Sequence, residues 1–366
     1  MLSSTRWVES LSPWPKDGFG LGRMQALLER LGDPQTRFPA IHVVGTNGKS
    51  TTTRLTEELL RSEGLHVGAY FSPHVRGWSE RIRVNGADAD FEQAIGRVRA
   101  HAEDATQFEV LTAAALLEFA HREVDVAVVE AGLGGRHDAT NVLGTRVVVL
   151  TSVALDHMEV LGDTREQIAA EKLAVVRPGA IAVLGDPEWE GLARVNGAER
   201  VELPGASNLA LAVAAAQAFL GREVDPHAAD GISLPGRLER AGEAPLEIWD
   251  GAHNLAGLGY LLPRLPDRQD WVVVASILED KRPEQMLEAL SVLGGRLVAT
   301  ESSNARAVPA GDLADRAKPY FQHVVADPDP RAARARARAL AGPEGAVVVT
   351  GSLYLLAELG DPSDRS

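Results

Sequence analysis

The chain has 366 residues, of which 45% are hydrophobic and 24% charged, so its length favours two domains and it has ample apolar material for a core. Its net charge of −14 argues against a duplex nucleic-acid surface, because such partners require clustered Lys and Arg. The absence of cysteine excludes disulfides, thiolate nucleophiles and Cys-based zinc sites.

The first predicted strand runs into a glycine-rich turn and then a helix-forming segment, reading IHVVGTNGKSTTTRL over residues 41–55. Gly45 and Gly48 permit backbone angles that a Cβ would forbid. Backbone N–H groups can therefore approach a polyphosphate, and the N-terminus of the following helix adds the positive end of its dipole. The pattern predicts a nucleotide site.

The side chains that follow the turn fit the same interpretation. Lys49 is placed to reach the β- and γ-phosphate oxygens, and the hydroxyls of Ser50 and Thr51 are placed near a bound Mg²⁺. The strict P-loop pattern has Gly where Val43 stands. The alternative interpretation is an ordinary glycine turn between a strand and a helix.

Short apolar runs alternate with helical segments through the rest of the first half. Further strands are expected at 67–71, 124–131, 146–153 and 180–185, and helices at 110–122, 164–176 and 207–220. Uninterrupted apolar runs of this length suit strands that are buried on both faces. The alternation predicts an α/β fold with a mostly parallel sheet and a nucleotide at the carboxyl end of its first strand.

A turn-rich segment without periodicity follows the helix at 207–220, and we place the domain boundary within 234–245. The expected domains are a nucleotide-binding domain over 1–235 and a smaller α/β domain over 236–366. Strands of the second domain are expected at 246–252, 271–278, 296–302, 323–328 and 346–352. The arginine-rich run at 331–340 is interspersed with alanines, which indicates a solvated helix face rather than a nucleic-acid tail.

Several polar side chains stand where strands should end. Glu130 precedes a glycine-rich loop and is either a Mg²⁺ ligand or a loop acid, while His157 follows the strand at 146–153. Arg237 and Asp250 are either nucleotide contacts or a loop salt bridge. Spacing alone favours a surface position for Lys172, with its stem over apolar residues.

Motifs in a fixed order resemble the folylpolyglutamate synthase/dihydrofolate synthase family of the Mur ligase superfamily. They are GTNGKS at 45–50, SPH at 72–74, ERI at 80–82, EAGLGGRHDATN at 130–141, LDHMEVLG at 155–162, EK at 171–172, PGRLE at 235–239, DGAHN at 250–254, LEDK at 278–281 and TGSLYL at 350–355. The resemblance covers about residues 20 to 356. It implies a P-loop-containing Mur-ligase-like N-terminal domain and a smaller Rossmann-like C-terminal domain.

The resemblance implies an ATP-dependent ligase of folate biosynthesis. ATP phosphorylates the carboxylate of dihydropteroate or a reduced folate, and L-glutamate attacks the acyl phosphate to give the amide, ADP and phosphate. Implied cofactors are ATP and Mg²⁺ at two sites, and the family pattern admits a carbamylated Lys172 and a monovalent cation. We expect a monomer with small-molecule substrates and without nucleic-acid or membrane partners. The N-terminus lacks the apolar core of a signal peptide, and no run reaches the roughly 20 apolar residues of a bilayer span, so a cytoplasmic location is expected.

Roles carried over from the family cover four groups of residues. The ATP contacts are Thr46, Asn47, Gly48, Lys49, Ser50, Asn208, Arg237 and Asp250. The Mg²⁺ ligands are Ser72, Glu130 and His157. The catalytic residues are Lys49, Lys172 and His253. The residues on the pterin side are Phe108, Glu109, His137, Asp138 and Ala139.

The chain departs from the family pattern at two places. Ser50 stands where many folate ligases have Gly, and the segment 183–209 is short, which implies that a peripheral β-region is missing. Two alternatives to a folate ligase are a Mur-type cell-wall amino-acid ligase and a catalytically inactive nucleotide-binding regulator.

Overall fold

A computed structural model describes residues 3–16, 18–268 and 270–360. Their contacts divide the described chain into two compact units. The first comprises the residues up to His74 and those from Trp78 to Ile232. The second runs from Ser233 onward and also includes the tripeptide Val75–Gly77, which no sequence pattern separates from its neighbours.

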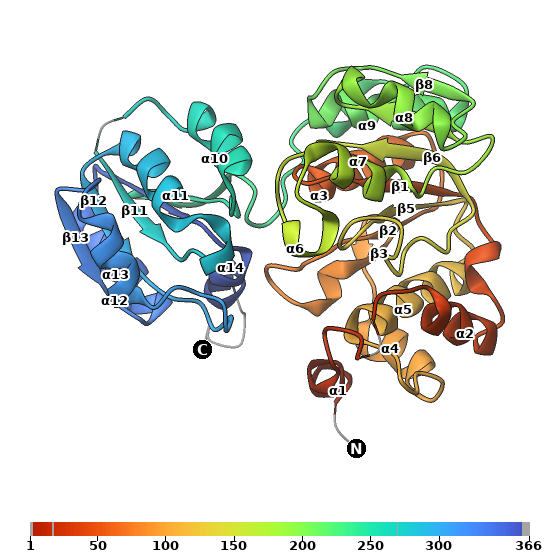
Figure 1. Ribbon diagram of the computed structural model, residues 1–366, viewed down its shortest axis with the longest axis horizontal. Coiled ribbons are helices and arrows are strands. Elements are labelled where there is room, and N and C mark those ends of the chain that lie inside the picture. Colours follow the sequence, from red (N-terminus) through yellow and green to blue (C-terminus); the bar gives the residue numbers. More distant parts are fainter. Residues whose placement is uncertain (1–2, 17, 269, 361–366) are drawn as a thin grey trace. The chain divides into compact units, whose positions relative to one another are not determined.

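The first unit contains an eight-stranded sheet within the described residues, in the order β4-β3-β2-β5-β1-β6-β7-β8 (Figure 1). Its strands are β1 (Ala40–Val44), β2 (Val67–Tyr70), β3 (Ile82–Val84), β4 (Ala87–Asp88), β5 (Val126–Glu130), β6 (Thr145–Leu150), β7 (Ile181–Leu184) and β8 (Arg200–Glu202). All neighbours pair in parallel except β2 with β3 and β3 with β4. The predicted mostly parallel sheet is confirmed, whereas the β3–β4 hairpin was not foreseen.

Helices cover both faces of this sheet because alternate side chains of each parallel strand point to opposite sides. Ile41 and Val43 pack toward α3 (Lys49–Ser62) and α9 (Asn208–Leu220). On the opposite face, one part of the core involves α1 (Ser4–Ser10), α2 (Gly22–Arg30), α4 (Phe91–Arg99) and α5 (Gln107–His121). The other part involves α6 (Met158–Leu161), α7 (Arg165–Leu173) and α8 (Glu190–Val195).

The second unit contains a six-stranded sheet within the described residues, in the order β13-β12-β11-β14-β10-β9. Its strands are β9 (Glu239–Glu243), β10 (Leu246–Trp249), β11 (Trp271–Ala275), β12 (Arg296–Ala299), β13 (His323–Ala326) and β14 (Ala346–Thr350), and only β9 runs antiparallel to its neighbour. One face packs on α10 (Leu255–Leu261), α11 (Pro283–Leu290) and α12 (Ala310–Ala317), and the other on α13 (Pro330–Ala341) and α14 (Leu353–Gly360). The predicted α/β character of the second half is confirmed.

The arginine-rich run forms the helix α13, as predicted, with Arg331 and Arg336 exposed to solvent, and two of its other arginines have a buried partner. Arg334 and Arg338 both bind the carboxylate of Glu247, which is fully buried on β10. Their guanidinium groups therefore compensate a buried charge, while Ala333 and Ala337 pack against the sheet. The alanine spacing brings the short side chains to the core and leaves two arginines at its edge.

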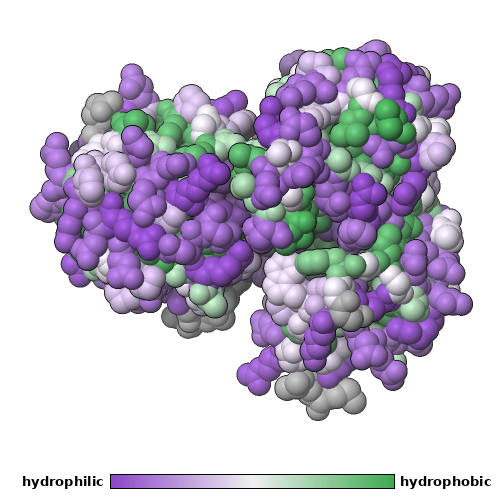
Figure 2. Space-filling model, viewed as in Figure 1, coloured by the Kyte–Doolittle hydropathy of each residue, from purple (hydrophilic) through white to green (hydrophobic). Residues whose placement is uncertain are grey.

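The surface seen in Figure 2 is mostly hydrophilic, with scattered hydrophobic patches, as is usual for a globular chain with 24% charged residues. Among the described residues, no helix combines the length and the apolar character that crossing a membrane requires.

Candidate nucleotide and acceptor site

The turn between β1 and α3 is built so that only glycine fits at two positions. Gly48 has a φ of +86°, and an added Cβ there would lie 2.5 Å from Oδ1 of Asn208. At Gly45 an added Cβ would lie 1.9 Å from Oγ1 of Thr151. The loop therefore packs directly against the start of α9 and the end of β6, and its backbone N–H groups precede a helix N-terminus, as anion binding requires.

The two residues inside the turn are held by the segment that follows β6. The N–H of Thr46 donates to the carbonyl of Ser152 at 2.8 Å, and the N–H of Asn47 donates to the hydroxyl of Ser152 at 3.0 Å. Thr151 returns a hydrogen bond from its hydroxyl to the carbonyl of Asn47 at 2.7 Å. These contacts fix the loop before a ligand binds, which lowers the ordering cost of binding.

Two lysines share one carbonyl oxygen at this loop. Nζ of Lys49 donates to the carbonyl of Gly45 at 3.1 Å, and Nζ of Lys172 donates to the same oxygen at 2.9 Å. Lys172 is 3% exposed, so the surface position favoured by its spacing is wrong. Burial, together with the charge of Lys49, lowers the pKa of Lys172 to about 7. Near neutral pH a large fraction of Lys172 is therefore a neutral amine.

Glu130 joins the nucleotide loop to the segment after β2. Its Oε1 accepts a hydrogen bond from the hydroxyl of Ser50 at 2.9 Å, and its Oε2 accepts one from the N–H of Ser72 at 3.1 Å. Glu130 is 2% exposed and Ser72 9%. A carboxylate with the Ser50 hydroxyl beside it, at the carboxyl end of a strand and next to a phosphate loop, offers the oxygen donors that Mg²⁺ prefers.

His157 lies at the start of α6 in the left-handed backbone region, with a φ of +51°. Its ring nitrogens are 4.0 Å from Asp156 and 3.8 Å from Glu159. In the part of the chain that the structure describes, no group of three or more His, Asp or Glu side chains is arranged to hold a metal. Ligation by His157 together with Ser72 and Glu130 stays a prediction.

The glycine-rich loop after β5 packs against both Phe108 and the helix that carries Lys172. An added Cβ at Gly132 would lie 2.6 Å from the ring of Phe108, and one at Gly135 would lie 2.6 Å from the carbonyl of Lys172. The N–H of Arg136 donates to the carbonyl of Glu171 at 3.0 Å. The loop thus connects the predicted acceptor side to the lysine site.

The buried carboxylate of Asp138 holds this loop in place through hydrogen bonds from the loop's backbone. The carboxylate accepts hydrogen bonds from the N–H of Leu133 at 2.8 Å and of Thr140 at 3.0 Å, and from the hydroxyl of Thr140. Burial raises the pKa of Asp138, and the hydrogen bonds from Thr140 and Leu133 act in the opposite direction. Ala139 is also buried, whereas His137 is exposed.

Glu109, which is predicted to lie on the pterin side, also stabilises the start of α5. It forms a capping box with Thr106 at the start of α5 and an ion pair with Arg23 at 3.2 Å. Phe108, one residue earlier, is half-buried. The capping box was not predicted, although Thr106 and Glu109 have its S/T-x-x-E spacing.

The residues predicted from the second half converge on the carboxyl end of β10. Asp250 accepts hydrogen bonds from the N–H groups of Leu238 at 2.8 Å and Ala252 at 2.9 Å. Burial raises the pKa of Asp250, while the charge of Arg237 opposes the shift. Nδ1 of His253 lies 2.9 Å from the carbonyl of Gly251. Arg237, Asp250 and His253 therefore form one cluster within the second unit.

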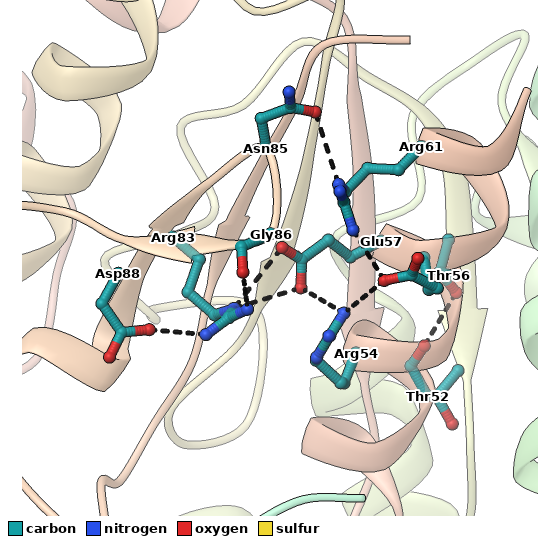
Figure 3. Close-up of polar contacts among 10 residues, drawn as sticks. Thr52, Arg54, Thr56, Glu57, Arg61, Arg83, Asn85, Gly86 and Asp88 are labelled. Atoms are coloured by element: carbon teal, nitrogen blue, oxygen red, sulfur yellow. Dashed lines mark hydrogen bonds and ion pairs between the residues drawn. The ribbon is translucent and has the colours of Figure 1, made fainter. Parts of the chain in front are cut away.

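A charged network that the sequence did not reveal supports helix α3 (Figure 3). Glu57 is fully buried and binds Arg54 at 3.0 Å and Arg83 at 3.4 Å, and Arg83 also binds Asp88 at 2.5 Å. Burial raises the pKa of Glu57, and the charges of Arg54 and Arg83 oppose that shift. The network connects the helix that begins at Lys49 to the β3–β4 hairpin.

A second unforeseen contact fixes the segment after Ser72. Nε of Arg81 donates to Nδ1 of His74 at 3.0 Å, and the His74 ring lies 4.4 Å from that of Trp78. Burial, together with the charge of Arg81, lowers the pKa of His74 to about 3. His74 is therefore a neutral acceptor at physiological pH.

Comparison with known proteins matches this architecture to one class of enzyme. Residues 43–221 match the Mur ligase middle domain, and residues 236–353 match the Mur ligase glutamate ligase domain. The dihydrofolate synthase/folylpolyglutamate synthase of Bacillus subtilis is 31% identical over 93% of this chain and 94% of its own length. The corresponding Mycobacterium tuberculosis protein is 32% identical over 86% of this chain and 81% of its own length.

Solved structures give the same result. Escherichia coli FolC in complex with DHPP and ADP is similar with a TM-score of 0.88 and 29% identity, covering 98% of this chain and 97% of that structure. Mycobacterium tuberculosis folylpolyglutamate synthase complexed with ADP has a TM-score of 0.87 and 28% identity, covering 97% and 96%. The fold and the phosphate loop are those of a Mur-type ligase. The chain belongs to the dihydrofolate synthase/folylpolyglutamate synthase family, and it is an ATP-dependent amino-acid ligase.

Proposed function

We propose that the protein joins L-glutamate to a pterin-type acceptor, dihydropteroate or a reduced folate, through an acyl phosphate. The acceptor carboxylate attacks the γ-phosphorus of ATP and ADP leaves. The glutamate amine then attacks the acyl carbon, and phosphate leaves after the amine has lost its proton. The observation that carries this proposal is the convergence of Lys49, Lys172, Ser50 and Glu130 around one phosphate loop.

Charge neutralisation and alignment are the main requirements of this phosphoryl transfer. We assign the phosphates to the backbone of Thr46, Asn47 and Gly48 and to the ammonium of Lys49. Nζ of Lys49 binds the carbonyls of Gly45 and Thr46 at 3.1 and 3.3 Å. Lys49 must break these hydrogen bonds in order to reach the phosphates. The loop itself is already held in place by Thr151 and Ser152.

The oxygen donors beside the loop fit a divalent cation. We assign Glu130, Ser72 and His157 to Mg²⁺, with Ser50 beside them, and a second ion near Lys172. Bound there, Mg²⁺ would offset the negative charge that phosphates and the acceptor carboxylate bring together. A manganese-bound structure of the Yersinia pestis relative supports use of a divalent metal in this family.

We propose that Lys172 is carbamylated. Its neutral amine can attack carbon dioxide, forming the Nζ–C bond and losing one proton, so that a cationic side chain becomes an anionic one. The lowered pKa of Lys172 supports this step, because only the neutral amine is nucleophilic. An anion beside Lys49 would remove the repulsion between two ammonium groups.

The acceptor is assigned to the side of the loop after β5. Phe108 supplies an aromatic face for a flat heterocycle, and Glu109, His137, Asp138 and Ala139 line the same side. We also assign Asn208, which lies against Gly48, to ATP binding. Arg237 and Asp250 of the second unit are assigned to ATP as well, and His253 lies close to both. The proposal retains a monomeric, cytoplasmic enzyme, and gel filtration tests the oligomeric state.

The two alternatives have less support. A cell-wall ligase would require a UDP-linked substrate, whereas the named relatives above are folate enzymes. An inactive regulator would have no need to retain Lys49, Glu130, His157 and Lys172 together.

The deciding experiment measures phosphate release from Mg-ATP and L-glutamate with dihydropteroate in one reaction and tetrahydrofolate in another. We expect release that requires glutamate and at least one of these acceptors. Turnover only with a UDP-muramoyl substrate would overturn the substrate assignment. Nucleotide binding without turnover on any acceptor would favour the regulator.

A further inference from the structure

His42 is a polar residue in the middle of an otherwise apolar central strand. The strand β1 reads AIHVV, all five residues are buried, and His42 is fully inaccessible. Because strand side chains alternate, it lies on the face of the sheet opposite to Ile41 and Val43. Its Nδ1 has no hydrogen-bond partner in the described part of the chain. A buried polar atom without a partner is unfavourable, and valine or isoleucine would suit the strand better.

The other ring nitrogen begins a chain of hydrogen bonds that ends in the acceptor loop. Nε2 of His42 lies 2.8 Å from Oγ1 of Thr140, which is also fully buried. The Thr140 hydroxyl donates to Oδ1 of Asp138, and Oδ2 of Asp138 accepts from the N–H of Leu133. These hydrogen bonds therefore link the central strand to both ends of the turn between Leu133 and Thr140.

The direction of these hydrogen bonds follows from the number of protons available. A threonine hydroxyl has one proton, and here that proton is used on Asp138. With Asp138 as a carboxylate, Thr140 accepts from His42, and the imidazole proton is assigned to Nε2. Burial, together with the charge of Arg177, lowers the pKa of His42 to about 3, so the ring is neutral and keeps a single N–H. Arg177 itself binds Asn141 at 2.8 Å.

We propose that His42 is a positioning residue for the acceptor, acting through Thr140 and Asp138 on the loop that follows β5. The imidazole N–H orients the Thr140 hydroxyl, the hydroxyl orients the carboxylate, and the carboxylate holds the N–H of Leu133. The proposal rests on the proposed function only in taking this loop as the acceptor side. Nucleotide binding uses the other loop, between β1 and α3, and should be unaffected.

The test compares His42→Leu, which removes the donor, with His42→Gln, whose amide N–H can replace Nε2. We expect His42→Leu to raise the KM for the pterin acceptor about tenfold while the Kd for ADP changes less than about twofold. His42→Gln should restore most of the acceptor KM. Thr140→Val should reproduce the effect of His42→Leu, and the double variant should be no worse than either single one.

Two measurements do not depend on turnover. Nitrogen NMR of the wild-type histidines should show His42 as the Nε2–H tautomer across neutral pH. Amide hydrogen exchange at Leu133 should be about tenfold faster in His42→Leu and in Thr140→Val. An Nδ1–H tautomer, unchanged exchange at Leu133, or equal losses of acceptor and ADP binding would each overturn the proposal. If His42→Leu does not fold, His42→Gln and Thr140→Val still decide it.

Phe108→Ala separates this inference from the proposed function. If Phe108→Ala raises the acceptor KM and Thr140→Val does not, the loop is the acceptor side but His42 does not position it. If Phe108→Ala leaves acceptor binding unchanged while exchange at Leu133 responds to His42→Leu, the hydrogen-bond chain exists but the acceptor assignment is wrong, and the inference fails as a statement about substrate.

Discussion

Replacing Glu247 by Gln tests whether the buried charge on β10 stabilises the second unit. The carboxylate accepts hydrogen bonds from Arg334 at 2.6 and 3.1 Å, from Arg338 at 2.5 Å and from the Trp249 indole at 2.6 Å. An amide keeps the volume but loses the charge and turns one acceptor into a donor that faces these donors.

The expected loss is about 3 kcal/mol, between the cost of losing charged hydrogen bonds and that of breaking a buried ion pair. We place it toward the lower end because the two arginine side chains are 33% exposed and can regain water. Glu243→Gln is the matched control, since Glu243 pairs with Arg240 on the surface and is 74% exposed. It should change stability by less than about 0.5 kcal/mol.

Urea unfolding followed by tryptophan fluorescence measures the difference, because Trp249 and Trp271 both lie in the second unit. Burial acts to raise the pKa of Glu247, but hydrogen bonds from Arg334 and Trp249 lower it overall. The stabilisation that the charged Glu247 provides is therefore present at pH values above 4.5, the ordinary pKa of glutamate, and is lost as the pH falls through the lowered pKa. A loss below about 1 kcal/mol at pH 7, or one that does not shrink in acid, would refute the reasoning.

Three further predictions concern the nucleotide loop. Lys49→Ala should lower kcat at least about 100-fold with an unchanged thermal midpoint, and full activity would remove Lys49 from its assigned role. Lys172→Ala should lose activity, and added bicarbonate should not restore it. The wild-type rate should rise through about pH 7 as the Lys172 amine becomes neutral. Normal turnover of the variant would exclude carbamylation as a requirement. Gly48→Ala should raise the KM for ATP more than about tenfold, because its Cβ would meet Asn208. Gly205→Ala, with a φ of +95° but no atom within 4 Å, is the control and should leave that KM nearly unchanged.

Local pattern was enough to predict the strand, turn and helix around Gly48, because the turn and the helix start are set by residues adjacent in sequence. It was also enough for the parallel strands β1, β2, β5, β6 and β7, which are four to six residues long, but not for the three-residue strand β8. The β3–β4 hairpin was missed because its strands have only three and two residues.

The burial of Lys172 could not be predicted from its own helix. It depends on a glycine loop more than 30 residues earlier, where Gly135 allows the backbone to approach Lys172. The partner of His42 is likewise 98 residues away. Such contacts are set by the packing of elements and leave no periodic signal near either residue.

The placement of Val75–Gly77 limits how this protein can be dissected. Val75 is 6% exposed and packs among Trp249, Leu355 and Leu356, so a recombinant fragment that starts at Ser233 would lack part of its own interior. Cutting the gene after Ile232 would leave the C-terminal fragment with a cavity in its core, and the N-terminal fragment with a tripeptide that lacks its apolar neighbours. A synthetic peptide spanning residues 75–77 with its flanks would have to be supplied in trans to complete the C-terminal piece.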